Sequence, residues 1–163
     1  MFILFLFTLL FCWFSIVDMK YISKSAKDTA AAASNILNKE IKKKRSGALV
    51  FGLYGDLGAG KTAFVKETAR LLGVKGVVTS PTFVILKKYK IKDSVFKNLI
   101  HIDAYRLESA KDLEQLDWNM AVKNPTNIIF IEWADRVENA LPKNTARINF
   151  EFIDERTRKI KII

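Results

Sequence analysis

Cysteine and histidine are almost absent from this chain of 163 residues, which has one of each, Cys12 and His101. A single cysteine excludes an internal disulfide framework, and one cysteine with one histidine is too few for a zinc site of those residues. The three prolines do not form a linker, and the chain has no internal repeat or low-complexity segment. We therefore expect a cytoplasmic protein of a reducing compartment, whose fold depends on a hydrophobic core.

Acidic residues are the minority charge, because 17 of them stand against 27 lysines and arginines, which gives a net charge of +10. This excess favours nucleic acid, phosphate groups or an acidic protein surface as a partner, although a solvated lysine-rich surface has the same composition. Half of the residues are apolar, which is enough for one globular domain with its own core.

The longest uncharged apolar run, MFILFLFTLLFCWFSIV, fills residues 1–17 and ends before Asp18. It is at the short limit for a membrane span, no lysine or arginine precedes it, and no small-residue cleavage site follows it. Because the composition changes abruptly at Met19, we predict that the native protein begins there and that residues 1–18 are not part of it. A short membrane anchor is the alternative. We expect residues 19–163 to form one domain without stable membrane association.

Hydrophobic periodicity in residues 19–163 predicts alternating helices and strands. Apolar residues at helical spacing predict one helix at about 25–42 and another at 61–72. Unbroken apolar runs at 48–54 and 127–132 predict strands that are buried on both faces of a sheet.

The remaining segments complete a mixed sheet. Residues 82–91 and 96–102 predict an antiparallel hairpin, and strict alternation after residue 147 predicts a C-terminal β-hairpin. Further helices are expected at 109–120 and 133–140. The predicted fold class is a three-layer α/β domain with a mixed sheet and a C-terminal β-hairpin.

The segment GDLGAGKT, at residues 55–62, matches the GxxxxGK[ST] pattern of a P-loop. In this pattern the glycines let backbone amides turn toward phosphate oxygens, the lysine neutralises terminal phosphates, and the hydroxyl can ligate Mg²⁺. Lys61 and Thr62 hold those two positions. The motif lies between a predicted buried strand and a predicted helix, which favours nucleotide binding over an ordinary glycine-rich turn. We predict a P-loop NTPase-like domain, and the absence of an NKxD motif after the loop favours ATP.

Two carboxylates end apolar strands, Asp103 after NLIHI and Glu132 after NIIFI. The carboxyl ends of such strands lie beside the phosphate loop of a parallel-type sheet, so each residue is a candidate to ligate metal or to position water. For a lone carboxylate, a helix cap or a surface ion pair would be the simpler interpretation.

Three neighbouring features leave alternatives open. His101 shares a strand face with Asp103 if the strand forms, so it could orient that carboxylate. Arg106 could reach a γ-phosphate or could form a structural ion pair. The segment SPTF, at 80–83, could sense a γ-phosphate or could be a turn that leads into a strand.

Together these segments resemble the TsaE family of small bacterial P-loop ATPases, also called YjeE. The segments that carry the resemblance are GDLGAGKT at 55–62, TSPTF at 79–83, HIDAYRL at 101–107 and IEWAD at 131–135. SKSAKDT at 23–29 is similar to the start of the family, and RKIKI at 158–162 is similar to its closing strand. The chain departs from the family at Ile102, where a phenylalanine is usual, and this change keeps an apolar residue.

The resemblance implies a Mg²⁺-dependent ATPase needed to form threonylcarbamoyl-adenosine next to the anticodon of tRNA. It implies action on a TsaB–TsaD complex, which is reset between turnovers and through which tRNA is reached. Asp103, Glu132 and Lys61 would be catalytic, and Thr62 and Glu132 would hold Mg²⁺. Together with the motifs, the resemblance assigns the nucleotide site to Thr29, Gly55, Asp56, Leu57, Gly58, Ala59, Gly60, Lys61, Thr62, Ser80, Thr82, Trp133 and Arg158, with Arg156 as an alternative to Arg158.

Two other functions compete with this interpretation. The chain could be a nucleotide-gated module that binds tRNA or protein, with incidental hydrolysis. A small-molecule kinase would need an acceptor site and lid arginines, which no segment clearly supplies.

Overall fold

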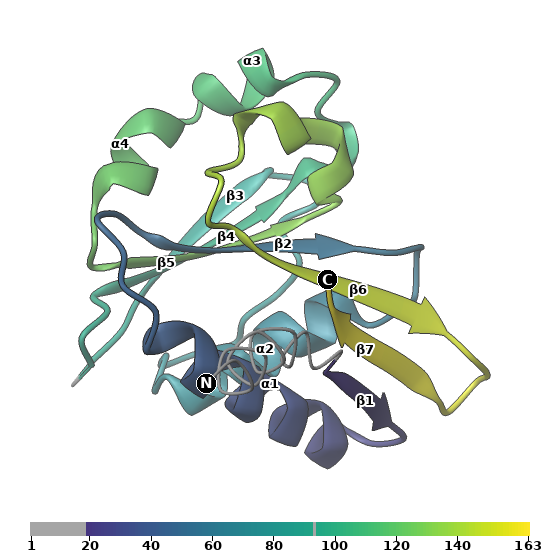
Figure 1. The fold of residues 1–163 in the computed structure, drawn as a ribbon. Helices are drawn as coiled ribbons and strands as arrows, with labels where there is room; N and C mark the ends of the chain where they lie inside the picture. The colour runs from purple at the N-terminus through teal and green to yellow at the C-terminus, as the bar shows by residue number, and fades with distance from the viewer. Residues whose placement is uncertain (1–18, 93) are drawn as a thin grey trace, which may run out of the picture.

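The computed structural model describes residues 19–92 and 94–163, and in these ranges a seven-stranded mixed sheet forms the middle layer (Figure 1). The expectation that residues 1–18 are not native lies outside the described residues. In chain order the elements are β1 (Lys20–Ser23), α1 (Ala26–Ile41), β2 (Leu49–Tyr54), α2 (Lys61–Leu71), β3 (Leu86–Lys90), β4 (Asn98–Asp103), η1 (Ala104–Arg106), α3 (Ala110–Glu114), α4 (Trp118–Lys123), β5 (Asn127–Glu132), η2 (Ala134–Ala140), β6 (Ala146–Phe152) and β7 (Arg158–Ile162).

The strand order is β1-β7-β6-β2-β5-β4-β3. The four central strands, β6, β2, β5 and β4, are parallel to their neighbours within this group, whereas β1, β7 and β3 pair antiparallel. Asp103 pairs in register with Glu132, which also pairs with Leu53 at the end of β2. The register therefore brings both predicted carboxylates to the edge of the sheet where β2 ends.

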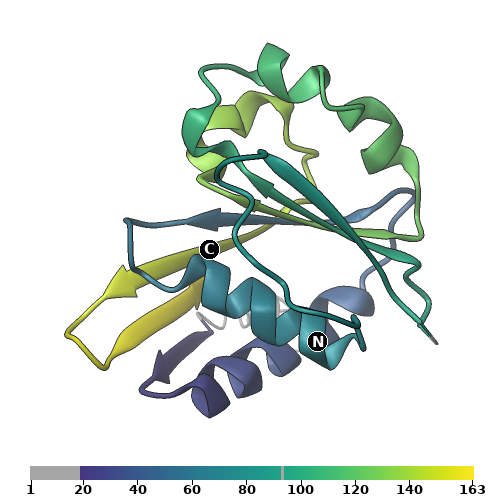
Figure 2. The same cartoon turned by 180° about the vertical axis from the view of Figure 1, so that it is seen from behind.

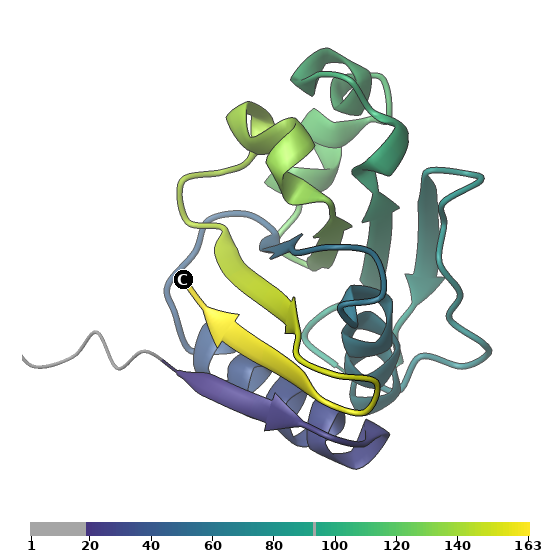
Figure 3. The ribbon, with the colours of Figure 1, turned by 90° about the vertical axis from the view of Figure 1, so that its right-hand side faces the viewer.

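Helices cover both faces of the sheet. α1 and α2 lie on one face, and α3, α4 and η2 lie on the other (Figures 1 and 3). Along β2, Phe51 and Leu53 point into the core under α1 and α2, whereas Val50 points into the second core. Phe51 stacks on Phe130 of β5 with ring centroids 4.8 Å apart, which links the two central strands. The predicted three-layer mixed-sheet fold with a C-terminal β-hairpin is confirmed.

Helix α1 begins where the sequence predicts it. The Ser25 hydroxyl accepts a hydrogen bond from the Asp28 backbone amide at 3.2 Å, and the Asp28 carboxylate accepts from the Lys24 amide at 3.0 Å. These contacts satisfy amides at the helix start that have no partner within the helix. The buried face of α1 then packs on α2.

Several boundaries differ from the sequence prediction. The helix expected at 109–120 is divided into α3 and α4, because Asp117 has a φ of 56° that an α-helix does not accommodate. β3 begins at Leu86 rather than Thr82, because Pro81 accepts hydrogen bonds from the Val84 and Ile85 amides and closes a turn first. The sequence also did not predict β1, whose four residues are too few to show a period.

Within the described ranges, no helix has the length and apolar character needed to traverse a bilayer.

Candidate functional site

The glycine-rich loop connects the end of β2 to the start of α2. Gly55, Gly58 and Gly60 have φ values of 123°, 76° and 105°, which side chains with a Cβ rarely adopt. At Gly55 a Cβ would also lie 2.1 Å from the Phe150 carbonyl oxygen, whereas at Gly58 it would meet no atom within 4 Å. Gly55 therefore permits close packing on β6, and Gly58 leaves open space above the loop.

The Lys61 side chain bends back over this loop. Its Nζ donates hydrogen bonds to the carbonyl oxygens of Gly55 and Asp56, the latter at 2.8 Å, and lies 4.0 Å from the centre of the Trp133 ring. Burial lowers the pKa of Lys61, and the negative charges of Glu132 and Asp103 partly oppose that shift. Lys61 is thus a desolvated cation held largely by backbone dipoles, close to the expected position of an anion.

Glu132 is the carboxylate nearest to the loop hydroxyl. Its Oε2 accepts a hydrogen bond from Thr62 Oγ1 at 2.9 Å, and its Oε1 lies 2.7 Å from His101 Nε2. Because an ionised carboxylate only accepts hydrogen bonds, we assign the proton to Nε2. His101 is fully buried, and its Nδ1 has no hydrogen-bond partner among the described residues.

The expectation that His101 orients Asp103 is therefore wrong, because the imidazole contacts Glu132 on the neighbouring strand. Asp103 instead turns toward the SPTF segment. Its Oδ2 accepts from Thr82 Oγ1 at 2.5 Å and from Ser80 Oγ at 3.4 Å, and its Oδ1 accepts from the Tyr105 amide at 3.0 Å. The contact between His101 and Glu132 depends on which strands are neighbours in the sheet, and the order of residues along one strand does not show this.

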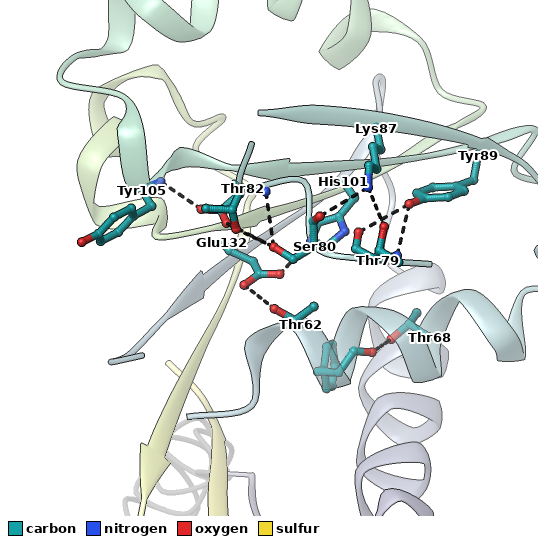
Figure 4. A network of polar contacts seen from close by, with 12 residues as sticks. Thr62, Thr68, Thr79, Ser80, Thr82, Lys87, Tyr89, His101, Tyr105 and Glu132 are labelled. Carbon is teal, nitrogen blue, oxygen red and sulfur yellow. Dashed lines mark hydrogen bonds and ion pairs between the residues drawn. The ribbon is translucent and has the colours of Figure 1, made fainter. Parts of the chain in front are cut away.

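The SPTF segment is a turn that leads into β3 and that also contacts the site. Its hydroxyls bond Asp103, and Lys87 of β3 donates to the Ser80 carbonyl at 3.4 Å (Figure 4). The turn ends at Ile85, whose φ of 63° is strained for a β-branched residue and whose carbonyl accepts from the Asp103 amide at 2.9 Å. Both interpretations offered for SPTF are compatible with this geometry.

An aromatic pair lies beside Lys61. Trp133 follows Glu132 directly with a φ of 57°, and its ring lies 5.2 Å from that of Tyr105. Arg106, one residue further along, stacks over Phe83 at 5.2 Å and does not line the cleft. The structure therefore does not bring Arg106 to the site, and it does not place it in an ion pair with a described residue.

Two adjoining hollows share Gly58 and Gly60 of the loop. The first, of about 450 Å³, is lined by Leu57, Gly58, Gly60, Lys61, Thr62, Ala63, Ser80, Thr82, Asp103, Tyr105, Glu132 and Trp133. The second, of about 390 Å³, is lined by Ser23, Lys24, Ser25, Thr29, Gly58, Ala59, Gly60, Ala63, Phe150, Glu155, Arg156, Arg158 and Ile160.

The structure brings most of the predicted residues to these two hollows. Thr29 and Arg158 line the second hollow rather than the first. Gly55 and Asp56 line neither hollow, and their carbonyl oxygens accept hydrogen bonds from Lys61. Arg158 Nε donates to the Gly58 carbonyl at 2.9 Å, whereas Arg156 lines the same hollow without a contact to the loop.

Tyr105 and Ser23 were missed by sequence reasoning. Tyr105 lies two residues after Asp103, on the turn that this carboxylate caps, so the strand-end position of Asp103 was the available signal. Ser23 reaches the site because β1 pairs with β7, and its hydroxyl hydrogen-bonds that of Thr29 at 2.7 Å. No local pattern in the sequence indicated that pairing.

The arrangement can hold a chain of phosphates and one divalent cation. The open loop and Lys61 form an anion cradle. No group of three or more His, Cys, Asp or Glu side chains gathers as a metal cage in the described ranges. A hydroxyl and a carboxylate beside a phosphate cradle are the donors with which Mg²⁺ is commonly held, since it keeps waters and takes phosphate oxygens as its other ligands.

Comparison with known proteins agrees with this geometry. The family model described as "Threonylcarbamoyl adenosine biosynthesis protein TsaE" matches residues 23–160. A "tRNA threonylcarbamoyladenosine biosynthesis protein TsaE" of Treponema pallidum is 34% identical over 144 residues, or 88% of this chain and 99% of that protein. Its namesake in Bacillus subtilis is 38% identical over 111 residues, or 68% of this chain and 66% of that protein.

A solved structure is also similar. The crystal structure of YdiB from Bacillus subtilis superposes with a TM-score of 0.66 at 29% sequence identity, and the match covers 89% of this chain and 84% of that one. The resemblance on motifs, the family model and the fold thus agree over nearly all of the described residues. The chain belongs to the TsaE family of threonylcarbamoyl adenosine biosynthesis proteins.

Proposed function

We propose that this chain is a Mg²⁺-dependent ATPase that resets a TsaB–TsaD complex between turnovers during threonylcarbamoyl-adenosine modification of tRNA. The observation that carries the proposal is the convergence of Lys61, Thr62, Asp103 and Glu132 on one cleft of about 450 Å³. Membership of the family supports the pathway, and the two carboxylates at the phosphate cradle support hydrolysis rather than binding alone.

The two hollows divide the nucleotide between them. The triphosphate would lie over the loop, where Lys61 exchanges its carbonyl partners for phosphate oxygens. The adenosine would lie in the second hollow, beside Thr29 and Arg158. Arg158 is favoured over Arg156 for this role because its guanidinium contacts the loop itself.

Thr62 and Glu132 would hold Mg²⁺, and their oxygens fit that role because they already lie 2.9 Å apart. When bound, the cation neutralises charge that develops on the phosphates. Thr62 and Glu132 would then supply oxygen ligands. The hydrogen bond from His101 Nε2 to Glu132 Oε1 keeps the Glu132 carboxylate in its orientation.

Asp103 would position the attacking water. Its carboxylate lines the cleft and is fixed by the Tyr105 amide on one oxygen, while the other oxygen contacts the Ser80 and Thr82 hydroxyls. A water that replaced those hydroxyls on Oδ2 would be held by a group able to accept its proton. Binding of that water at Oδ2 would displace the Ser80 and Thr82 hydroxyls from this oxygen.

The mouth of the cleft supports dependence on a partner. Leu57 lines the cleft and is 87% exposed, and Phe83, which follows the cleft-lining Thr82 in the chain, is 85% exposed. A partner that covered them would exclude water from the phosphates and strengthen the electrostatic contacts inside. We therefore expect slow hydrolysis by the isolated chain and faster hydrolysis with TsaB and TsaD.

Reconstitution tests the proposal. Purified chain is added with ATP and Mg²⁺ to TsaB, TsaD, an activated donor of the threonylcarbamoyl group and an unmodified tRNA, and modified tRNA is counted per TsaB–TsaD complex. We expect several modified tRNAs per complex with the chain, and about one without it. Equal yields of modified tRNA in both reactions would exclude the reset function. If the Lys61→Ala variant raised the yield as much as wild type, ATP bound to this chain would not be needed for the reset.

A further inference from the structure

The edge of the sheet at which the parallel strands begin is not used by the proposed nucleotide site. Because β2, β4, β5 and β6 run in the same direction, the segments that precede them meet at one edge, opposite the glycine-rich loop. In Figure 1 this edge is on the left, where the chain from α1, the end of β3, the start of β4 and the end of α4 come together. Figure 2 shows the same edge on the right.

Basic residues are concentrated at this edge. Residues 42–48, 90–97, 123–126 and 141–145 contain nine of the 27 basic residues of the chain and one of its 17 acidic residues, so they carry eight of the ten net positive charges. We call the basic side chains the amino-edge patch: Lys42, Lys43, Lys44, Arg45, Lys90, Lys92, Lys97, Lys123 and Lys143. All eight of these lysines are exposed.

Contacts between the segments fix them next to one another. The Arg45 guanidinium lies 5.0 Å from the centre of the Phe96 ring, which joins the chain after α1 to the β3–β4 turn. The Lys97 amide donates to the Thr126 carbonyl at 2.8 Å, which joins that turn to the loop before β5. Three of the segments also line one hollow of about 260 Å³, made by Ser46, Gly47, Ala48, Val122, Lys123, Pro142 and Asn144.

Little negative charge offsets the patch among the described residues. Lys43 pairs with the buried carboxylate of Glu40 at 2.7 Å. The Lys90 and Lys97 ammonium groups donate to neutral oxygens, those of the Asn98 side chain and the Ser94 carbonyl. The patch therefore presents a positive field to solvent at the end of the molecule away from the nucleotide cleft.

We propose that the amino-edge patch binds the phosphate backbone of RNA directly. Lysines are compact charges suited to phosphates, and they are depleted from protein–protein interfaces, where aromatic residues and arginine are enriched. In these segments Val95 is the one exposed large apolar side chain among described residues, so the patch lacks an apolar centre for a protein partner. From β6 to β3 the edge spans about 19 Å at the usual strand spacing, enough to meet several phosphates. The choice of tRNA as the RNA rests on the proposed function.

Anisotropy of a labelled, unmodified tRNA transcript tests this proposal with the full-length chain. The patch variant combines Lys44→Gln, Lys92→Gln and Lys123→Gln. The control variant combines Lys27→Gln, Lys66→Gln and Lys111→Gln, which removes the same charge from exposed lysines on other elements. Affinity is measured from about 50 to 200 mM KCl, because binding to phosphates weakens linearly in log–log form as salt rises.

We expect the patch variant to bind tRNA at least about tenfold more weakly than wild type near 100 mM salt. The slope of log affinity against log salt concentration should be smaller in magnitude by about 2. The control should change affinity by less than about threefold. Equal losses in both variants, or a wild-type chain that does not bind tRNA at low salt, would overturn the proposal. So would a patch variant that keeps tRNA affinity and loses binding to TsaB–TsaD, since the patch would then bind protein.

The ATPase provides a separate readout. Hydrolysis by the patch variant is expected to match wild type, and Lys61→Ala is expected to keep wild-type tRNA affinity. If the wild-type chain does not hydrolyse ATP, that result would count against the proposed function, and the anisotropy result would still decide whether the patch binds RNA. An effect of Lys61→Ala on tRNA affinity as large as that of the patch variant would move the RNA contact to the cleft and contradict the proposal.

Discussion

Some residues of the proposed site have positions that suit a bound ligand and that lower the stability of the folded chain without it. Lys61 is 5% exposed, and the hydrogen bonds of its ammonium group go to two backbone carbonyls. Burying a charge costs free energy unless an opposite charge compensates it, and a phosphate chain would supply that compensation. The strained backbone at Trp133 and Ile85 lies next to the two carboxylates of the same cleft.

Lys61→Met tests this cost, because it keeps most of the aliphatic stem and removes the charge. We expect loss of nucleotide binding, with a free energy of unfolding at neutral pH equal to wild type or up to about 1 kcal/mol higher. Burial lowers the pKa of Lys61, so the folded protein releases this proton at a lower pH than the unfolded chain. The wild type should therefore gain stability relative to the variant as the pH rises through the lowered pKa. Urea unfolding near pH 7 and in the alkaline range measures both effects, and a clearly destabilised variant at neutral pH would contradict them.

Asp103→Asn separates binding from hydrolysis. The amide keeps the size of the side chain and loses the charge that would accept a proton from water. We expect nucleotide affinity within about threefold of wild type and a turnover number reduced by at least about 100-fold. Equilibrium binding of a fluorescent ATP analogue and steady-state phosphate release provide the two values. Full turnover in this variant would remove Asp103 from the mechanism.

His101 is expected to act through Glu132. His101→Phe removes the Nε2 donor and keeps a ring in the buried site, so the Glu132 carboxylate loses one of its two orienting hydrogen bonds. Mg²⁺ is expected to increase the affinity for nucleotide. We expect the Mg²⁺ concentration that gives half of this increase to be about tenfold higher in His101→Phe than in wild type.

His101→Gln is the matched variant, because its amide can donate at a similar reach, and it should restore most of the Mg²⁺ dependence. Nucleotide affinity in EDTA should be the same in wild type and both variants. Equal defects in the two variants, or an unchanged Mg²⁺ dependence in His101→Phe, would reduce His101 to a packing residue.

At the scale of secondary-structure elements, short segments at the ends of helices and strands position the site. α1 presents Thr29 to the second hollow, and its first turn depends on the Ser25 cap. Hydrogen bonds from the Lys24 amide and the Ser25 hydroxyl lower the pKa of Asp28, so this helix cap stabilises the fold at neutral pH. This contribution is lost as the pH falls through the lowered pKa.

Ser25→Ala should therefore destabilise the chain by about 1 kcal/mol at neutral pH, with a smaller effect in acid. Ser34→Ala is the control, because Ser34 lies in the middle of the same helix, where alanine is the better helix former. Denaturant unfolding at the two pH values measures the difference. A Ser34→Ala variant as unstable as Ser25→Ala would show that the loss does not arise from the cap.

At the scale of the whole molecule, the sequence predicts the layers, the central strands and most of the cleft. Buried strands and the glycine-rich loop have strong local patterns, so β5 was predicted at its observed bounds and Lys61 in its observed place. Contacts across the sheet have no such pattern. Pairing of β1 with β7 and the reach of His101 to Glu132 depend on strand order, which apolar periodicity does not determine.

The position of the two proposed sites at opposite edges of the sheet leads to the last prediction. ATP would bind where β2 ends and RNA where β2 begins, with the buried core between them. Sites without shared partners are expected to be nearly independent, so the coupling free energy should be below about 0.5 kcal/mol. We expect tRNA affinity measured with and without ATP and Mg²⁺ to differ by less than about threefold, and the patch variant to leave ATP affinity unchanged. A change of tenfold or more in either affinity would mean that the sheet transmits the nucleotide state, and the chain would then be a nucleotide-gated RNA-binding module.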